Sequence, residues 1–173
     1  MQRFFPALQF FLQGFLYFRK VKIKKEVDRK EKAAEMYSNS LNCAQSVIGA
    51  FEDKLGNQCN ILMEAASGFG GGMGKLQKTC GAITSSIMIM SILKYKNMPD
   101  SKEKLEKNIQ ELVKRFEKKF GATDCLDIIT YNLNTESGKE KAKQEKIFER
   151  KCTKVVSQTV EWVSEIIDTE EIK

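Results

Sequence analysis

Cysteine is the residue type in this chain whose placement indicates chemistry. Three of the five cysteines directly follow a residue that often caps the N-terminus of a helix. These pairs are Asn42–Cys43, Thr79–Cys80 and Asp124–Cys125. Unpaired amide donors and the positive end of the helix dipole stabilise a thiolate at such a position. We therefore expect the pKa values of these thiols to lie below the usual value of about 8.5, which makes each sulfur a better metal ligand and a better nucleophile.

The other two cysteines differ in their surroundings. Cys152 precedes an apolar stripe of helical periodicity, whereas Cys59 lies in GNQCN, which offers no local reason for a reactive thiol. The chain has no histidine and no CxxC pair, which excludes Cys-His catalysis, zinc ribbons and thioredoxin-type motifs. Four thiols from different helices could bind an iron–sulfur cluster or zinc, or work as two redox pairs. Their spacing along the chain does not discriminate between these chemistries.

A glycine-rich stretch, GFGGGMGKLQKTCGAITSS, raises the question of phosphate binding. A Walker A loop would need a glycine at position 69 and a hydroxyl residue at position 76, where the chain has Phe69 and Leu76. The dinucleotide motif GxGxxG also fails in every register, and no strand precedes the stretch. The sequence therefore argues against a phosphate loop.

The same glycines fit a different purpose. Because glycine allows positive φ and close backbone approach, we interpret Gly70, Gly71 and Gly72 as a sharp turn between two buried helices. This turn would let the next cysteine begin a buried helix near the other thiols. Lys75 and Lys78 are then candidates for stabilising a thiolate or an anionic cluster.

Helical periodicity dominates the rest of the chain. The run 80–95 is apolar on nearly every face, so we expect a buried central helix there. Asp100 with Glu103 predicts a capping box for the next helix, and Gly121 predicts its C-terminal cap. No segment alternates strictly, so the predicted fold is all-α, a compact bundle of about six helices around the central one, with the glycine-rich turn before it. The expected helices cover 27–37, 43–55, 60–66, 80–95, 100–120, a short segment from 124, 139–151 and 152–168.

The N-terminal segment differs from the rest in charge. Residues 1–30 hold eight Lys or Arg and two acidic residues, so the formal charge of +6 of the whole chain belongs to them. We assign 1–30 as a tail and 31–173 as the cysteine-containing helical domain, whose neutral balance argues against nucleic-acid binding. Residues 4–25 combine an aromatic face with basic residues, which favours an anchor on an anionic membrane surface. A packed helix, or a leader absent from the mature protein, are the alternatives. An odd number of cysteines without an obvious cleavable signal does not resemble a secreted disulfide scaffold, so we expect a cytoplasmic protein, with the tail as its means of membrane association.

Several short motifs occur in a distinctive order: NCAQSVIGAF, GFGGGMG, CGAITSS, FGATDCLDII and a late cysteine. In this order they resemble a family of redox-active proteins named for its C_GCAxxG_C_C cysteine pattern. The resemblance covers residues 33–165, and Cys59 falls outside the cysteine pattern of the family. The same domain is similar to the non-haem part of split-Soret cytochromes, where cysteines are associated with an iron–sulfur centre. Because the chain has no CxxCH, no haem is expected. The family cysteines implied here are Cys43, Cys80, Cys125 and Cys152.

The residues and the resemblance together favour a redox function based on thiols. In the first hypothesis the four family cysteines bind an iron–sulfur cluster, most simply [2Fe–2S], that exchanges electrons with a redox partner protein. Zinc is the less favoured metal. In the second, the chain is a metal-free thiol–disulfide oxidoreductase or redox sensor that cycles a disulfide such as Cys43–Cys80. In the third, it is a membrane-associated helical adaptor whose cysteines only pack. The sequence leaves a homodimer open.

Overall fold

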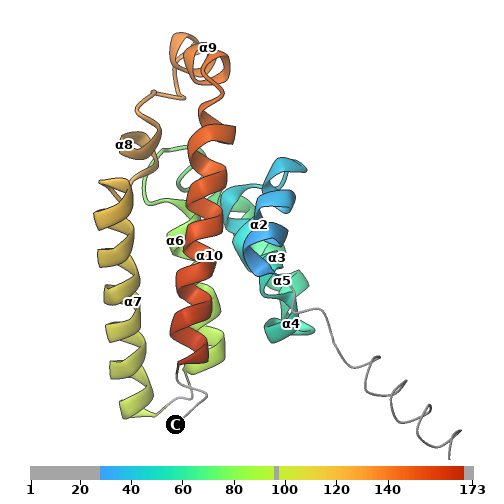
Figure 1. Cartoon of the computed structure of the whole chain (residues 1–173), viewed down its shortest axis with the longest axis vertical. Helices are drawn as coiled ribbons and strands as arrows, with labels where there is room; N and C mark the ends of the chain where they lie inside the picture. Colours follow the sequence, from blue (N-terminus) through green and yellow to red (C-terminus); the bar gives the residue numbers. More distant parts are fainter. Residues whose placement is uncertain (1–27, 96–97, 170–173) are drawn as a thin grey trace, which may run out of the picture.

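The computed structural model describes residues 28–95 and 98–169, and within them the fold is all-α, as predicted (Figure 1). Helix α10 runs alongside α7 on one side and packs against α2 on the other, with α6 behind it. The shorter helices α8 and α9 lie together at one end of the long ones. The helices are α2 (Arg29–Ser38), α3 (Cys43–Ala50), α4 (Glu52–Leu55), α5 (Gln58–Ala65), the 3₁₀ segment η1 (Ala66–Phe69), α6 (Gly81–Lys94), α7 (Pro99–Phe120), α8 (Cys125–Ile129), α9 (Glu136–Gln144), the π-helical segment η2 (Phe148–Cys152) and α10 (Thr153–Asp168).

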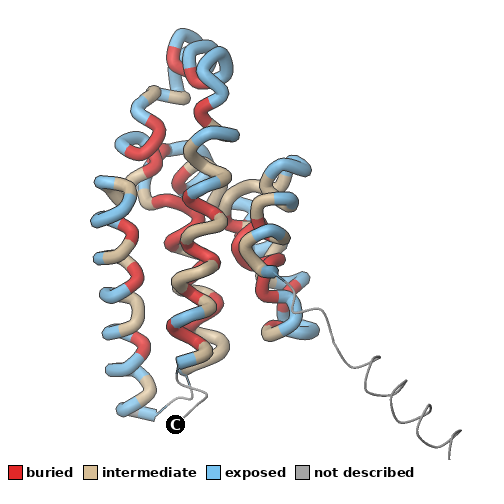
Figure 2. Tube along the Cα trace, viewed as in Figure 1, coloured by how far each residue is buried: buried red, intermediate tan, exposed pale blue. Residues whose placement is uncertain are grey.

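Helix α6 is the buried centre that its apolar sequence predicts. It contacts α3, α7 and α10, and its residues Ile89 and Met90 are fully buried (Figure 2). Helix α7 contributes Phe116 to this core, and Phe120 at its end packs against Trp162 of α10, with the ring centroids 6.0 Å apart and the rings tilted by 57°. The predicted apolar stripe of α10 is buried along its whole length, at Val155, Val156, Thr159, Val163 and Ile166.

Two helix ends test the capping predictions. Gly121 ends α7 in the left-handed conformation, with φ of 82°, and its N–H donates to the carbonyl of Glu117, as predicted. The start of α7 differs, because the helix begins at Pro99 and not at Asp100. Met98 is the N-cap, and its N–H donates to the hydroxyl of Ser101. The predicted capping box of Asp100 with Glu103 is therefore wrong by two positions, since proline is itself favoured in the first turn.

The glycine-rich stretch folds into a left-handed turn. Five consecutive residues, 71–75, have φ between 57° and 69°. Backbone hydrogen bonds hold the turn, from the N–H of Gly74 to the carbonyl of Gly68 and from the N–H of Lys78 to the carbonyl of Gly72. This geometry reverses the chain between η1 and α6, as the sequence predicts. It also places side-chain-bearing residues in a conformation that costs L-amino acids about 1–2 kcal/mol each.

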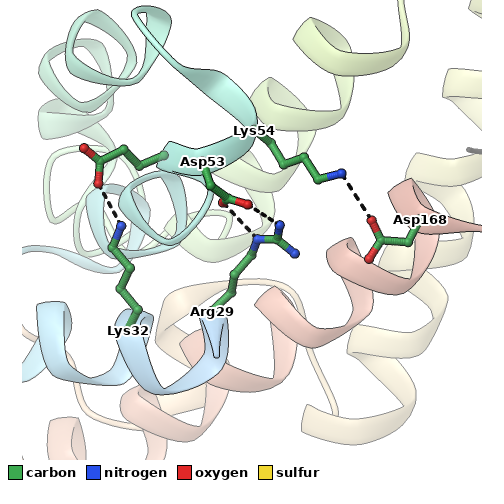
Figure 3. A network of polar contacts seen from close by, with 6 residues as sticks. Arg29, Lys32, Asp53, Lys54 and Asp168 are labelled. Atoms are coloured by element: carbon green, nitrogen blue, oxygen red, sulfur yellow. Dashed lines mark hydrogen bonds and ion pairs between the residues drawn. The ribbon is translucent and has the colours of Figure 1, made fainter. Parts of the chain in front are cut away.

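Ion pairs on the surface tie α2 to α4 and α4 to α10 (Figure 3). The guanidinium of Arg29 binds the carboxylate of Asp53 and also lies over the ring of Phe51, 5.4 Å from its centroid. Nearby, the ammonium of Lys54 lies 3.7 Å from the carboxylate of Asp168 near the end of α10. Because such exposed pairs contribute about 1 kcal/mol at most, α2 is held mainly by its packing on α10.

In the described ranges, no helix combines the length and the apolar character that crossing a membrane requires. The predicted membrane-surface contact falls on residues 4–25, outside the described residues.

The left-handed turn generates a stability prediction. At Gly72, with φ of 69°, an added Cβ would lie 2.3 Å from the carbonyl oxygen of Lys78 and 2.9 Å from the Cβ of Cys125. We expect Gly72→Ala to lower the free energy of unfolding by about 2–4 kcal/mol, from backbone strain and overpacking together. The measurement is the midpoint and slope of urea unfolding.

Gly68→Ala is the matched control. An added Cβ there meets no atom within 4 Å, so we expect a change within about 0.5 kcal/mol. Equal effects of the two substitutions would show that the turn does not impose the constraint described.

Candidate functional site

Cys43 is the first residue of α3, and its neighbour Asn42 caps this helix. The side-chain oxygen of Asn42 accepts hydrogen bonds from the N–H groups of Ala44 (2.9 Å) and Gln45 (3.0 Å). The amide of Asn42 donates to the carbonyl of Ser67 at 3.0 Å. The predicted cap is present, and the same side chain also joins the start of α3 to the segment that enters the glycine turn.

Backbone pairing brings Cys80 close to Cys125. The two segments before α6 and α8 form an isolated antiparallel β-bridge between Thr79 and Asp124. Within it, the N–H of Cys80 donates to the carbonyl of Thr123, and the N–H of Cys125 donates to the carbonyl of Lys78, both at 2.8 Å. Because Thr79 is extended in this bridge, Cys80 itself is the N-cap of α6, one position later than the sequence predicts.

Gln77 supports this bridge and was not found from the sequence. Its side chain is buried, donates to the carbonyl of Tyr131 at 2.7 Å and accepts from the N–H of Leu133 at 2.6 Å. These bonds tie the glycine turn to the chain that follows α8. A single glutamine in a polar loop gives no sequence signal for such a role.

Cys152 reaches the site at the end of η2, and Tyr37 meets it from α2. The hydroxyl of Tyr37 donates a hydrogen bond to the Cys152 sulfur, and burial raises the pKa of both groups, to about 11 for Cys152. A π-helical segment is uncommon and often occurs at functional sites. Tyr37 was also missed by sequence reasoning, because its partner lies at the other end of the chain.

The four predicted cysteines line one cavity of about 410 Å³. Tyr37 and Gly71 are also part of its wall. Cys59, predicted to be incidental, lies elsewhere: it is buried in α5, with its sulfur 3.9 Å from the carbonyl of Ile48. The cysteines at the cavity are Cys43, Cys80, Cys125 and Cys152.

Cys43 is the acidic thiol of this group. The Cys80 thiol donates a hydrogen bond to its sulfur, as do the N–H groups of Gly71, Gly81 and Ala44, and together they lower the pKa of Cys43 to about 6 against the opposing effect of burial. Gly81 is close enough that an added Cβ would lie 2.7 Å from this sulfur. Cys43 is therefore the thiol of this cavity that loses its proton most readily.

The other two helix-start thiols contradict the prediction of lowered pKa values. The hydrogen bond to Cys43, followed by burial, raises the pKa of Cys80. Burial raises the pKa of Cys125 to about 12, and the nearby carboxylate of Asp124 adds to the effect. Helix α8 has only five residues, so its dipole offers little to offset these terms.

The supporting residues named from the sequence divide into two groups. Gly71 donates to the Cys43 sulfur, and an added Cβ on Gly70 would lie 2.7 Å from the Cβ of Asn42, so both allow close approach to the start of α3. Lys75 and Lys78 are exposed, and neither lines the cysteine cavity.

Among residues 28–95 and 98–169, no three side chains of Cys, Asp or Glu lie close enough together to hold a metal ion.

Fold and site together define an all-α protein whose four dispersed cysteines meet at one cavity. The model of the C_GCAxxG_C_C family, described as "Putative redox-active protein", matches residues 41–166, and the chain belongs to this family. The resemblance inferred from the ordered motifs is thus confirmed. A protein of Archaeoglobus fulgidus, described as an uncharacterized protein, is 27% identical over 143 residues, which cover 76% of this chain and 88% of that protein. No solved structure matches the chain.

The acidity of Cys43 generates a labelling prediction. Alkylation by iodoacetamide, followed by mass spectrometry of the Cys43 peptide, should give a rate that is half-maximal near pH 6 and falls about tenfold per pH unit below it, since only the thiolate reacts. Cys80→Ala removes the principal donor, so the midpoint should move up towards the ordinary cysteine value. Cys80→Ser keeps a hydroxyl donor and should shift it less.

Cys59→Ala is the control, because Cys59 lies outside the cavity and its removal should leave the Cys43 profile unchanged. A midpoint that stays near pH 6 in Cys80→Ala would show that the Cys80 thiol does not stabilise the thiolate.

Proposed function

We propose that this protein carries out thiol–disulfide exchange, with Cys43 as the nucleophile and Cys80 as the resolving thiol. The observation that carries the proposal is that Cys43 and Cys80 line the same cavity, where the Cys80 thiol lowers the pKa of Cys43. Membership of a family described as redox-active supports the same class of chemistry. A thiolate beside a protonated thiol is the arrangement that such exchange requires.

The reaction takes place in two steps. The Cys43 thiolate attacks one sulfur of a substrate disulfide, forming a mixed disulfide and releasing the first substrate thiolate. Cys80 then attacks the Cys43 sulfur, forming the Cys43–Cys80 disulfide and releasing the second substrate thiolate, which takes up the proton that Cys80 loses. The protein dithiol is thereby oxidised by two electrons, and the substrate disulfide is reduced to one thiolate, which takes up a proton from water according to its own pKa, and one thiol.

The coupling between the two thiols gives this sequence its order. In the reduced protein the hydrogen bond to Cys43, with the charge on that sulfur, keeps the pKa of Cys80 high. Once Cys43 is part of a mixed disulfide, its sulfur carries no charge and the largest cause of that raised pKa is gone. Burial still raises the pKa of Cys80, which is only 6% exposed, so the Cys43 sulfur beside it, and not a second substrate molecule, is the target of its attack.

An iron–sulfur centre is the second candidate, and one observation favours it: all four family cysteines line the same cavity. Cys43, Cys80, Cys125 and Cys152 would hold the cluster, which when bound would supply one-electron transfer with a redox partner protein. The described side chains do not form a ready metal-ligand set, so the sulfurs would have to move closer together. For this reason the dithiol function is the better supported of the two.

The dithiol function is tested by exposing the folded protein to an oxidant and counting its free thiols after unfolding in denaturant. With 2-hydroxyethyl disulfide as oxidant, we expect the free thiols to fall from five to three and to return with dithiothreitol. Peptide mapping should find the Cys43–Cys80 link. In Cys80→Ala a mixed disulfide should persist on Cys43, because no thiol resolves it, while Cys59→Ala should cycle normally. A disulfide confined to another pair, or no reversible loss, would refute the proposal.

The cluster is tested separately by anaerobic reconstitution with iron and sulfide. Bound iron and sulfide, with visible absorption that is lost in Cys125→Ser and in Cys152→Ser but kept in Cys59→Ser, would establish the second candidate. Absence of bound iron from the reconstituted wild-type protein would leave the dithiol function alone.

A further inference from the structure

A second pocket, of about 640 Å³, adjoins the cysteine cavity. The two share four wall residues: Asn42, Gly71, Leu133 and Phe148. One of these, Gly71, donates its N–H to the Cys43 sulfur. A molecule seated in the second pocket would therefore lie next to the reactive thiolate. Its volume falls within the range of about 300–1,000 Å³ that is usual for small-molecule sites.

The charge of this pocket has one sign. Three lysines line it, Lys75 from the glycine turn and Lys139 and Lys143 from α9, and none of its lining residues is acidic. Lys139 pairs with Glu136 at 2.6 Å, whereas Lys75 and Lys143 form no ion pair within the described part of the chain. The pocket thus presents cations that are available to an anionic ligand.

The backbone at Lys75 is a separate observation. Lys75 ends the left-handed run with φ of 66°, a conformation that suits glycine and costs a lysine about 1–2 kcal/mol. Strain of this kind is found at ligand sites, where the surrounding structure holds it in place. Here it places a cation on the wall that faces α9.

We propose that the lysine pocket binds the anionic end of a small disulfide substrate while the disulfide bond of that substrate reaches Cys43. This inference rests on the thiol–disulfide function proposed above and specifies its substrate class. The exchange then proceeds through the same two steps at Cys43 and Cys80, with the anionic group held on the lysines during the first attack. Carboxylate and phosphate groups share the required chemistry, because a lysine ammonium binds either as a point charge.

The test compares three disulfides of similar size and different charge. These are 3,3′-dithiodipropionate, which is dianionic, 2-hydroxyethyl disulfide, which is neutral, and cystamine, which is dicationic. We expect Cys43–Cys80 to be oxidised about tenfold faster by the dianion than by the neutral compound, and slowest by the dication, since a pocket of one charge raises the local concentration of its counter-ion. Added glutarate and inorganic phosphate, as competitors, show which anionic group is held more tightly.

Variants locate the effect in the pocket. In the double variant Lys75→Gln/Lys143→Gln the dianion should oxidise the protein at most about twofold faster than the neutral compound, because the electrostatic attraction is lost. Lys75→Gly removes the same charge and relieves the backbone, so it should act in the same direction without loss of fold. Lys141→Gln is the control: this lysine lies on the same helix, is exposed and does not line the pocket.

A binding arm separates the two proposals. Cys43→Ser cannot react, and calorimetry should show that it binds 3,3′-dithiodipropionate saturably, with binding lost when Lys75→Gln and Lys143→Gln are added. If no disulfide oxidises the wild-type protein, the thiol–disulfide function fails, whatever the pocket binds. If all three disulfides react equally and Cys43→Ser binds no dianion, the pocket inference fails and the exchange function stands. If Lys141→Gln weakens the preference as much as the pocket variants, the effect comes from overall charge and the inference is overturned.

Discussion

The close approach of three chain segments to the Cys43 sulfur is the constraint on which the rest of the structure depends. The sulfur accepts from the N–H groups of Ala44 at the start of α3, Gly71 in the left-handed turn and Gly81 at the start of α6. A Cβ added to Gly81 would lie only 2.7 Å from this sulfur and 2.9 Å from the carbonyl oxygen of Phe69, so there is no room for a side chain at this position. The start of α6 and the left-handed turn are therefore held close to the start of α3.

The cavity shows how hydrogen-bond donors, and not location alone, decide the acidity of a thiol. Burial penalises every charged sulfur in it. Cys43 overcomes this penalty because a thiol and three amides donate to it, whereas Cys152 has a donor only in Tyr37 and stays protonated at neutral pH. Cysteines that line the same cavity thus have pKa values shifted in opposite directions, and a redox pair needs such a difference between its two thiols.

The sequence predicts those parts of the fold that depend on local periodicity. The apolar run of α6 and the stripe of α10 repeat at helical spacing, so their burial could be read from residue types alone. The role of Thr79 could not, because its β-bridge with Asp124 joins segments far apart in the chain. The lowered pKa was predicted for three thiols and is found only at Cys43, since it depends on donors that other segments bring. The convergence of the cysteines was suggested by the ordered motifs, while Tyr37 and Gln77 are fixed by tertiary packing.

The thiol of Cys59 can be used to follow local unfolding of the protein around α5. Its thiol is 3% exposed and has a raised pKa, so reagents reach it when the core around α5 separates. Cys43, in contrast, is reactive in the native state. Labelling of the two sulfurs in one sample therefore records two different processes: the chemistry of the intact site, and the rate or population of local unfolding. In this protein a single alkylating reagent can follow folding dynamics and site reactivity together, with no probe added to the chain.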